Sequence, residues 1–188
     1  MKKSLLMLTC CVALSGCAPA VFVAGAAAGG VVTGDNRTIG TKWNDQVLAN
    51  NLREHLHSNE DIHYDANVSV ATFNHSVLLT GTVPDQALHD KVLEITRGEP
   101  GVKRVHDQLR IARHITVSQA TSDTWITTKI KTLMVAEKNL NSTHIKVVTD
   151  NGTVFLFGLV DRRQADLATN VTRHVPGVKK VVKLFEYM

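Results

Sequence analysis

Apolar residues recur along this chain in two similar copies, and each copy opens with a predicted helix. Residues spaced by four lie on one face of a helix, and both copies contain such a set. The sets, which we expect to be buried, are Leu48, Leu52 and Leu56 in the first copy and Ile126, Ile130, Leu133 and Met134 in the second. Asp45 and Asp123 stand where the N-caps of the two helices are expected.

Each predicted helix is followed by two strands, a second helix and a last strand. The turn between the first two strands contains Asn74-His75 in copy one and Asp150-Asn151-Gly152 in copy two. Asn-Gly between two apolar runs is a strong hairpin signal. The expected bounds of these elements are 68–72, 77–80, 85–97 and 104–111 in the first copy, and 145–149, 154–157, 161–174 and 180–187 in the second.

Two short motifs repeat at a nearly constant offset and indicate an internal duplication. Val77-Leu78-Leu79-Thr80-Gly81 matches Val154-Phe155-Leu156-Phe157-Gly158 after 77 residues, and Pro100-Gly101-Val102 matches Pro176-Gly177-Val178 after 76 residues. The order αββαβ therefore occurs twice. We predict an α+β fold of two tandem domains, 43–112 and 120–188. In each, two helices pack on one face of a three-stranded mixed sheet, and we expect the partner copy to cover the other face.

The N-terminus resembles the signal of a bacterial lipoprotein. Met1-Lys2-Lys3 is positive, and the apolar run 5–14 is too short to span a bilayer. The run ends in Leu14-Ser15-Gly16-Cys17, which resembles a lipobox. The resemblance implies that 1–16 is a cleaved signal peptide and that Cys17 is lipidated with diacylglycerol and an amide-linked palmitate-like chain. The alternative is an ordinary signal peptide with a chance cysteine.

Residue 18 is Ala and not the Asp that retains such lipoproteins at the inner membrane, which favours the outer membrane. The segment 17–42 is rich in Gly, Ala and Thr and is expected to be a flexible acylated tether. As a coil, the 26 residues from Cys17 to Trp43 would span about 27 Å. Such a tether raises the effective concentration of the domains at the membrane surface.

Charge is divided unevenly between the two halves. Without Lys2 and Lys3, the chain has 19 basic and 17 acidic residues, a net charge of +2. Residues 43–112 carry 6 basic and 10 acidic side chains, whereas 113–188 carry 11 and 6. The halves, at −4 and +5, are therefore expected to meet different partners.

Each half resembles a BON domain, a periplasmic module with the order αββαβ. The resemblance rests on the strand that ends in Gly81 or Gly158 and on the later Gly-Val-x-x-Val at 101–105 and 177–181. The lipobox, the tether and the two copies together resemble the dual-BON-domain outer-membrane lipoproteins. That resemblance implies a non-enzymatic protein that binds anionic phospholipid through its second domain. It further implies localisation at the division site, a role in cell-envelope integrity and links to the outer-membrane protein assembly machinery.

In that family the lipid site lies on the first helix of the second domain, and the residues support it here. Trp125 shares one helix face with Thr128, Lys129 and Thr132, and indole is favoured at a bilayer interface. Lysines beside an anionic surface contribute about 1 kcal/mol each. The expected phospholipid-binding residues are Trp125, Thr128, Lys129, Lys131 and Thr132, with Lys138 as a further cation. Arg162 and Arg163, at the start of the other helix, either flank this patch or belong to a solvated face. The alternative is that Trp125 packs against the first domain or against the neighbouring helix.

Motifs for other chemistry were not found in the sequence. No His-Glu-x-x-His, Cys/His pairing or nucleophile elbow is present, and the nine histidines fit chance placement. We therefore expect no catalytic residues, no metal, no cofactor and no nucleic-acid partner, and a monomer. Two alternative functions remain open: a periplasmic scaffold that binds envelope proteins such as the assembly machinery, and a peptidoglycan-associated structural module.

Overall fold

The structure is a computed structural model that describes residues 39–112 and 117–188. These residues belong to one compact unit, Thr33–Met188. The first domain comprises α1 (Ile39–His57), α2 (Glu60–Asp65), β1 (Asn67–Phe73), β2 (Ser76–Val83), α3 (Gln86–Gly98) and β3 (Arg104–Ile111). The second comprises α4 (Val117–Ala136), the 3-10 turn η1 (Ser142–His144), β4 (Ile145–Asp150), β5 (Thr153–Val160), α5 (Arg162–Arg173) and β6 (Lys180–Tyr187).

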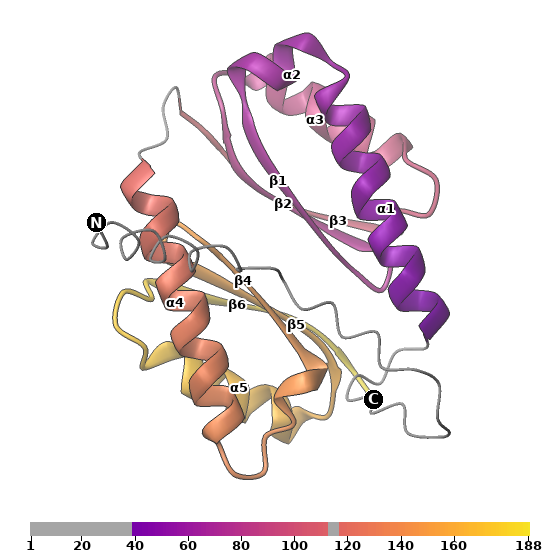
Figure 1. Cartoon of the computed structure of the whole chain (residues 1–188). Helices are drawn as coiled ribbons and strands as arrows, with labels where there is room; N and C mark the ends of the chain where they lie inside the picture. The colour runs from indigo at the N-terminus through magenta and orange to yellow at the C-terminus, as the bar shows by residue number, and fades with distance from the viewer. Residues whose placement is uncertain (1–38, 113–116) are drawn as a thin grey trace, which may run out of the picture. The chain divides into compact units, whose positions relative to one another are not determined.

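The two domains have the same sheet topology, which confirms the predicted fold class. In each, the central strand pairs antiparallel with the strand before it and parallel with the last strand, giving the orders β1-β2-β3 and β4-β5-β6. The helices of each domain lie on one face of its sheet (Figure 1). The short α2, six residues with Ile62 as its buried member, is an addition to the predicted order.

Both opening helices begin earlier than predicted. Helix α1 starts at Ile39, inside the segment expected to be tether, and α4 starts at Val117. Asp45 and Asp123 therefore lie within the helices, and their prediction as N-caps is wrong. The N-caps that the structure has are Asp85 and Asp161, which accept from the backbone N–H of Leu88 and Gln164.

The carboxylates of Asp45 and Asp123 hold the hairpin turns instead. Asp45 accepts from the backbone N–H groups of Asn74 and His75 at 2.7 and 2.9 Å. Asp123 accepts from those of Asn151 and Gly152 at the same distances. Both carboxylates are buried, so these bonds satisfy their charge and tie each opening helix to its hairpin.

Alternation along the strands divides each sheet into a helix-facing side and an open side. On the helix-facing side, Val77 and Leu79 join the core of the first domain, and Val154 and Leu156 that of the second. The open sides supply a third cluster, made of Phe73, Leu78, Phe155 and Phe157. Its members come from both domains, so the open side of each sheet is buried by the other copy, as expected.

The rings of Phe73 and Phe157 are stacked, with centroids 5.8 Å apart. Polar contacts lie around this apolar centre: Arg110 pairs with Asp150 at 3.1 Å, Lys146 donates to the carbonyl of Thr72 at 2.9 Å, and Glu186 accepts from Asn74 and Arg104. The three clusters draw on residues from Leu48 to Phe185. A fragment 33–188 therefore keeps every member and is expected to fold on its own.

Two glycines of the repeated motif lie where the backbone of a neighbouring segment leaves no room for a side chain. A Cβ on Gly81 would lie 2.0 Å from the carbonyl oxygen of Asn67, and one on Gly158 would lie 2.7 Å from that of His144. Gly81 also has a φ of +110°, which favours glycine. The motif is therefore a requirement of strand packing.

Candidate functional site

Helix α4 carries the predicted site residues and buries only one narrow stripe. Ile126, Ile130 and Met134 are fully buried, as predicted. Leu133 is 37% exposed, so its assignment to the core is wrong. At about 100° per residue, the side chains of Ile130 and Met134 point about 40° and 80° to one side of Ile126. The side chain of Leu133 points about 20° to the other side. It therefore lies at the edge of the buried stripe.

Trp125 is 52% exposed and lies opposite that stripe. By helix geometry, Thr132 and Lys129 lie within about 20° and 40° of the direction of Trp125. Two apolar side chains that the sequence reading missed flank this face at about 80° on either side: Leu133 and Val135, which is 74% exposed. Thr128, about 60° from Trp125, is exposed on the same side. These six residues form what we call the α4 face: Trp125, Thr128, Lys129, Thr132, Leu133 and Val135.

Lys131 takes a different position from the one that the prediction implied, whereas Thr128 lies about 60° from Trp125 on the predicted side. Lys131 is exposed but points about 120° away from Trp125, so only its long side chain can approach the α4 face. The hydroxyl groups of Thr128 and Thr132 donate to the carbonyls of Thr124 and Thr128, four residues earlier. Their hydrogens are therefore used within the helix, and both threonines can offer a ligand only acceptor oxygens.

The exposed surface of α4 has basic side chains without acidic neighbours on the same helix. Asp123 is the one carboxylate in the sequence of α4, and it is occupied by the hairpin turn. Within the described part of the chain, no carboxylate pairs with Lys129 or Lys131. The helix therefore presents unneutralised cations beside exposed apolar groups.

The other cations that were expected to flank the site differ in their surroundings. The guanidinium of Arg162 lies over the ring of Tyr187, 5.0 Å from its centroid. Lys138 and Arg163 are exposed. Arg162 is therefore held at the C-terminal strand and is the least suited of the three to contact a ligand on α4.

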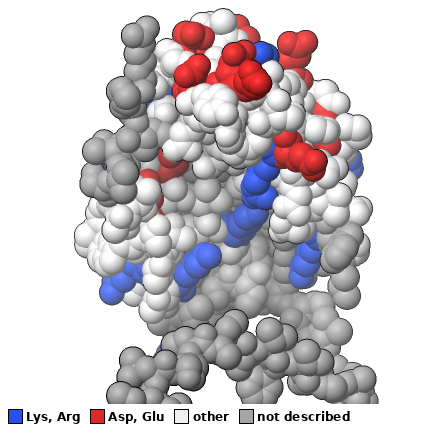
Figure 2. All heavy atoms as spheres, turned by 45° about the horizontal axis from the view of Figure 1, so that its top comes forward, with Lys and Arg blue, Asp and Glu red and all other residues white. Residues whose placement is uncertain are grey.

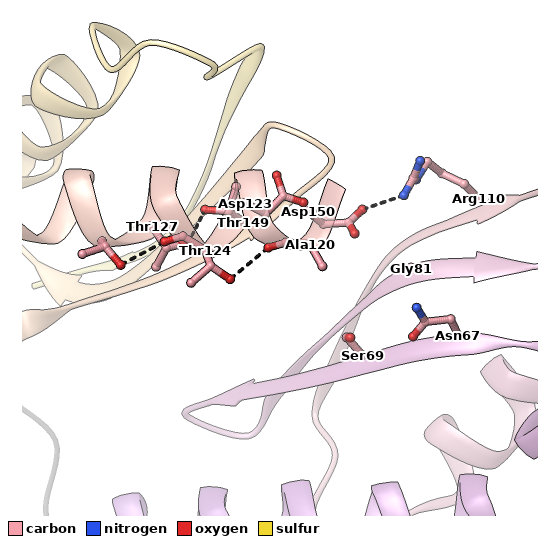
Figure 3. Close-up of a pocket in the computed structure, with 11 residues that line it drawn as sticks. Asn67, Ser69, Gly81, Arg110, Ala120, Asp123, Thr124, Thr127, Thr149 and Asp150 are labelled. Carbon is pink, nitrogen blue, oxygen red and sulfur yellow. Dashed lines mark hydrogen bonds and ion pairs between the residues drawn. The ribbon is translucent and has the colours of Figure 1, made fainter. Parts of the chain in front are cut away.

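A polar cleft of about 340 Å³ borders α4 on the side of Thr124, Thr127 and Thr128 (Figure 3). Thr127 donates to the hydroxyl of Thr149 at 2.7 Å. Burial raises the pKa of Asp150, an effect that nearby Arg110 opposes. The side chains of Thr124, Thr127, Thr128 and Arg110 already donate within the protein. Among the described residues, Asn67 and Ser69 are lining side chains that keep unused donors for a ligand.

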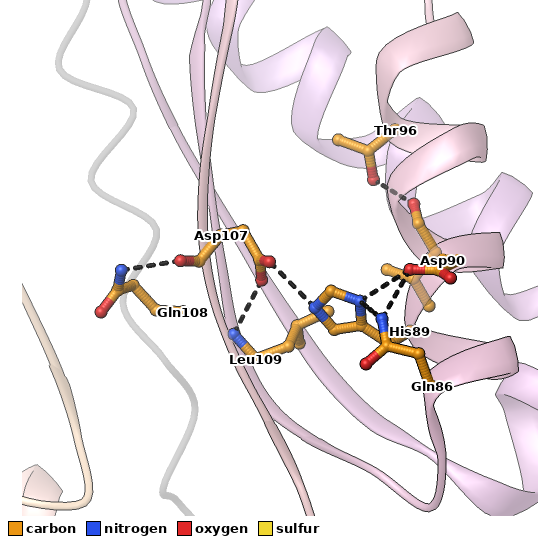
Figure 4. A network of polar contacts seen from close by, with 8 residues as sticks. Gln86, His89, Asp90, Thr96, Asp107, Gln108 and Leu109 are labelled. Atoms are coloured by element: carbon orange, nitrogen blue, oxygen red, sulfur yellow. Dashed lines mark hydrogen bonds and ion pairs between the residues drawn. The ribbon is translucent and has the colours of Figure 1, made fainter.

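The arrangement that most resembles catalytic machinery is a histidine between two carboxylates. His89 of α3 has Nε2 2.9 Å from Asp107 and Nδ1 3.2 Å from Asp90 (Figure 4). The hydrogen bond from His89, with one from Gln86, holds the pKa of Asp90 below its usual value. Both ring nitrogens of His89 have partners, so the network connects α3 to β3 and leaves no nitrogen for general-base chemistry.

Among 39–112 and 117–188, no cluster of three or more His, Cys, Asp or Glu side chains is arranged to hold a metal ion. None of the helices described there is both long and apolar enough to cross a membrane. The predicted lipidation site, Cys17, and the signal peptide 1–16 lie outside the described residues.

The chain therefore belongs to the class of proteins built from two tandem αββαβ domains, and its second domain opens with an exposed, basic helix. Residues 44–113 and 122–188 each match the family described as the BON domain, and the chain belongs to this family.

Three relatives match most of the length of this chain. It is 34% identical over 188 residues to the outer membrane lipoprotein DolP of Haemophilus influenzae, with 100% of this chain and 97% of the relative covered. It is 35% identical over 154 residues to a 21 kDa hemolysin of Actinobacillus pleuropneumoniae, covering 82% and 79%. It is 32% identical over 157 residues to osmotically-inducible protein Y of Escherichia coli, covering 82% and 78%. None of these three names is that of an enzyme.

Proposed function

We propose that this chain is a non-enzymatic, lipid-anchored lipoprotein of the outer membrane that faces the periplasm. In this proposal the anchor is on Cys17, and the second domain binds anionic phospholipid through the α4 face. Action at the division site in support of cell-envelope integrity is part of the proposal because the dual-BON-domain lipoproteins imply it. The likeness to the outer membrane lipoprotein DolP over the full chain supports the proposed location.

The observation that carries the lipid-binding proposal is the composition of the α4 face. Trp125, Leu133 and Val135 are large apolar side chains that remain exposed on one helix. An indole is most stable where its ring is in the apolar layer and its N–H in the wet one, and an amphipathic helix with basic groups lies in that interface. Lys129 and Lys131 then meet the lipid phosphates, at about 1 kcal/mol each.

The charge of the two domains supports one orientation. Residues 113–188 carry a net charge of +5 and residues 43–112 carry −4. An anionic bilayer attracts the positively charged second domain and repels the negatively charged first domain, within about one Debye length of 8–10 Å. The second domain is therefore expected to face the membrane.

Vesicle flotation with the fragment 33–188 tests the proposal. Binding should rise with the fraction of phosphatidylglycerol or cardiolipin and fall with salt. Trp125→Glu should weaken it at least tenfold, because a charge replaces the side chain that enters the interface. Tyr64→Glu is the matched control, since Tyr64 is a 79% exposed aromatic of the first domain, and it should bind like the parent.

The charge contribution is tested with Lys129→Glu/Lys131→Glu against Arg97→Glu/Lys103→Glu in the first domain. Only the first pair should reduce binding and its dependence on salt. If neither the parent nor any variant floats with anionic vesicles at low salt, the lipid-binding proposal is wrong. Retention of an envelope protein partner by Trp125→Glu would then favour the scaffold function.

A further inference from the structure

Two histidines at the end of the first domain have their ring nitrogens close together. His57 is the last residue of α1, and His63 lies in α2. Their Nδ1 atoms are 2.9 Å apart in a hydrogen bond, in which one ring donates to the other, and the rings meet edge to face with centroids 5.1 Å apart. A metal ion bound between the rings would replace this hydrogen bond. Both side chains are exposed. Neither contributes to the α4 face or to the interface between the sheets.

The backbone between the two histidines is well fixed. The side chain of Asn59 accepts from the N–H of Ile62 and caps α2, and the N–H of Ser58 donates to the carbonyl of Glu54. Ile62 is buried in the core of the domain. Because the turn is held at both ends, the fold keeps the two histidine side chains within reach of one another.

The separation of the nitrogens matches that of two ligands on one metal ion. Imidazole nitrogens lie about 2.0–2.1 Å from a transition metal. Two such nitrogens 2.9 Å apart subtend about 90° at the ion, whereas a tetrahedral ion would hold them about 3.3 Å apart. Right angles are those of square-planar and octahedral sites, which Cu(II) and Ni(II) favour among ions that imidazole binds.

The surroundings of the pair attract cations. The C-terminal end of α1 carries the negative end of its helix dipole. Glu60, Asp61 and Asp65 lie in α2, and Figure 2 shows acidic side chains gathered over the end of the first domain at the top of that view. Lys91 pairs with Asp61, so Glu60 and Asp65 are the carboxylates of α2 without a salt bridge among the described residues. Arg53 lines the same cleft, with its guanidinium donating to the carbonyl of Val70.

Space is also available beside the rings. His57 and His63 line a cleft of about 300 Å³ that also touches Leu56, Ile62 and Ala66. Water molecules that complete a coordination sphere fit in such a volume, since a water occupies about 30 Å³. No third side-chain ligand has to be supplied by the protein.

We propose that His57 and His63 form a two-histidine site for an exchangeable divalent transition-metal ion of the nickel or copper type, with water in the remaining positions. This revises the expectation that the chain binds no metal. That expectation rested on sequence motifs, and a pair that meets across a helix end has no motif spacing. The site is independent of the lipid-binding proposal, because it lies on the other domain.

Calorimetric titration of the fragment 33–188 with Ni²⁺ alone, at pH 7.5, tests this site. The fragment lacks all three cysteines of the chain, which removes thiol ligands. One Ni²⁺ should bind per chain, and His57→Ala or His63→Ala should each weaken binding at least tenfold. His174→Ala, which removes an exposed histidine of the second domain, should stay within twofold of the parent. Binding should also weaken at pH 5.5, where imidazole is protonated.

Mg²⁺ distinguishes the histidine pair from a general attraction to the acidic surface. Mg²⁺ prefers oxygen ligands, so it should give no site that depends on His57 or His63. In the parent fragment, paramagnetic Ni²⁺ should broaden the NMR signals of these two rings before those of any other histidine. Absence of Ni²⁺ binding, equal broadening of all histidines, or unchanged affinity in the double variant His57→Ala/His63→Ala would each overturn the proposal.

Discussion

At the scale of single residues, the interface between the sheets alters the pKa of His106. It lies on the open side of β3, and its ring meets that of Phe157 edge-on at 6.2 Å. Burial lowers the pKa of His106, and the charge of Arg104 lowers it further, while Glu186 opposes both. The folded chain therefore holds this ring neutral where an exposed histidine would begin to take up a proton.

This lowered pKa predicts a loss of stability in mild acid. Above about pH 6.5, the ordinary pKa of histidine, both the folded and unfolded states are neutral at His106, and its contribution is fully present. Below that pH the unfolded state takes up the proton first, so stability falls as pH falls through the lower, folded pKa. Chemical unfolding at pH 7.5 and 5.5 should show a smaller fall for His106→Gln than for the parent.

The control is His174→Gln, which should fall as the parent does. Asp150, whose pKa is raised by burial, acts in the opposite sense, since its contribution is lost as pH rises through the raised pKa. All three proteins retain Asp150, so the difference between them isolates His106. If the free energy of unfolding fell equally between pH 7.5 and 5.5 in the parent and in His106→Gln, the ring of His106 would not be held neutral.

At the scale of elements, the pairing of β1 with β2 depends on the absence of a side chain at Gly81. Gly81→Ala should lower the free energy of unfolding by about 3 kcal/mol or more, because a methyl group would overlap the carbonyl of Asn67 at an unfavourable φ. Gly98→Ala is the matched control. Gly98 ends α3 with open space around it, and alanine there should be neutral or stabilise by up to about 1 kcal/mol.

Thermal or chemical unfolding of both variants measures this difference. If Gly81→Ala were as stable as Gly98→Ala, the repeated glycine would not be needed for strand packing. The corresponding change at Gly158, whose Cβ would lie 2.7 Å from the carbonyl of His144, should have the same sign.

Elements with a clear apolar period were predictable from sequence, and those defined by distant contacts were not. The paired strands follow from alternation and Asn-Gly, and α3 and α5 follow from their place before the repeated Pro-Gly. Their capping aspartates, Asp85 and Asp161, were not recognised as caps. Helix α2 has one buried residue, Ile62, and therefore no period to detect. The first turn of α4 also lacks an apolar period, so the helix was predicted to begin at Asp123. The partners of the Asp123 carboxylate are the turn amides of residues 28 and 29 positions later in the chain.

The candidate site shows the same limit. Trp125 and Lys129 were found because their spacing of four places them on one face of an ideal helix. Leu133 was placed in the core by its spacing of seven from Ile126, since sequence spacing fixes a direction but not how wide the buried stripe is. Val135 was missed for the same reason. The engagement of the Thr128 hydroxyl by the carbonyl of Thr124 depends on a rotamer, which composition does not specify.

At the scale of the whole molecule, the open sides of the two sheets are joined through an aromatic centre. Phe157→Ala should cost about 3–5 kcal/mol, as for other buried aromatic residues, because the ring is 1% exposed and stacks on Phe73. Tyr64→Ala, at an exposed position, should change stability by less than about 0.5 kcal/mol. A cost below about 1 kcal/mol for Phe157→Ala in chemical unfolding would mean that the ring is in water.

This arrangement of the two copies was only partly visible in the sequence. β2 and β5 are apolar on both faces, as Leu78 and Phe155 show, and a strand buried on both faces reads as a continuous apolar run. The polar contacts around the centre, such as Arg110 with Asp150, join residues of different domains at sheet positions that no local pattern relates.

The proposed function requires the side chain of Trp125 to enter the interface of an anionic bilayer. The fragment 33–188 with Trp43→Phe leaves Trp125 as its only tryptophan, so its fluorescence reports on that one side chain. With vesicles rich in phosphatidylglycerol or cardiolipin, the emission should shift to shorter wavelength and be quenched by brominated acyl chains. With vesicles of neutral lipid, both effects should be absent. Emission of Trp125 that stays unchanged and unquenched with anionic vesicles at low salt would contradict the proposal.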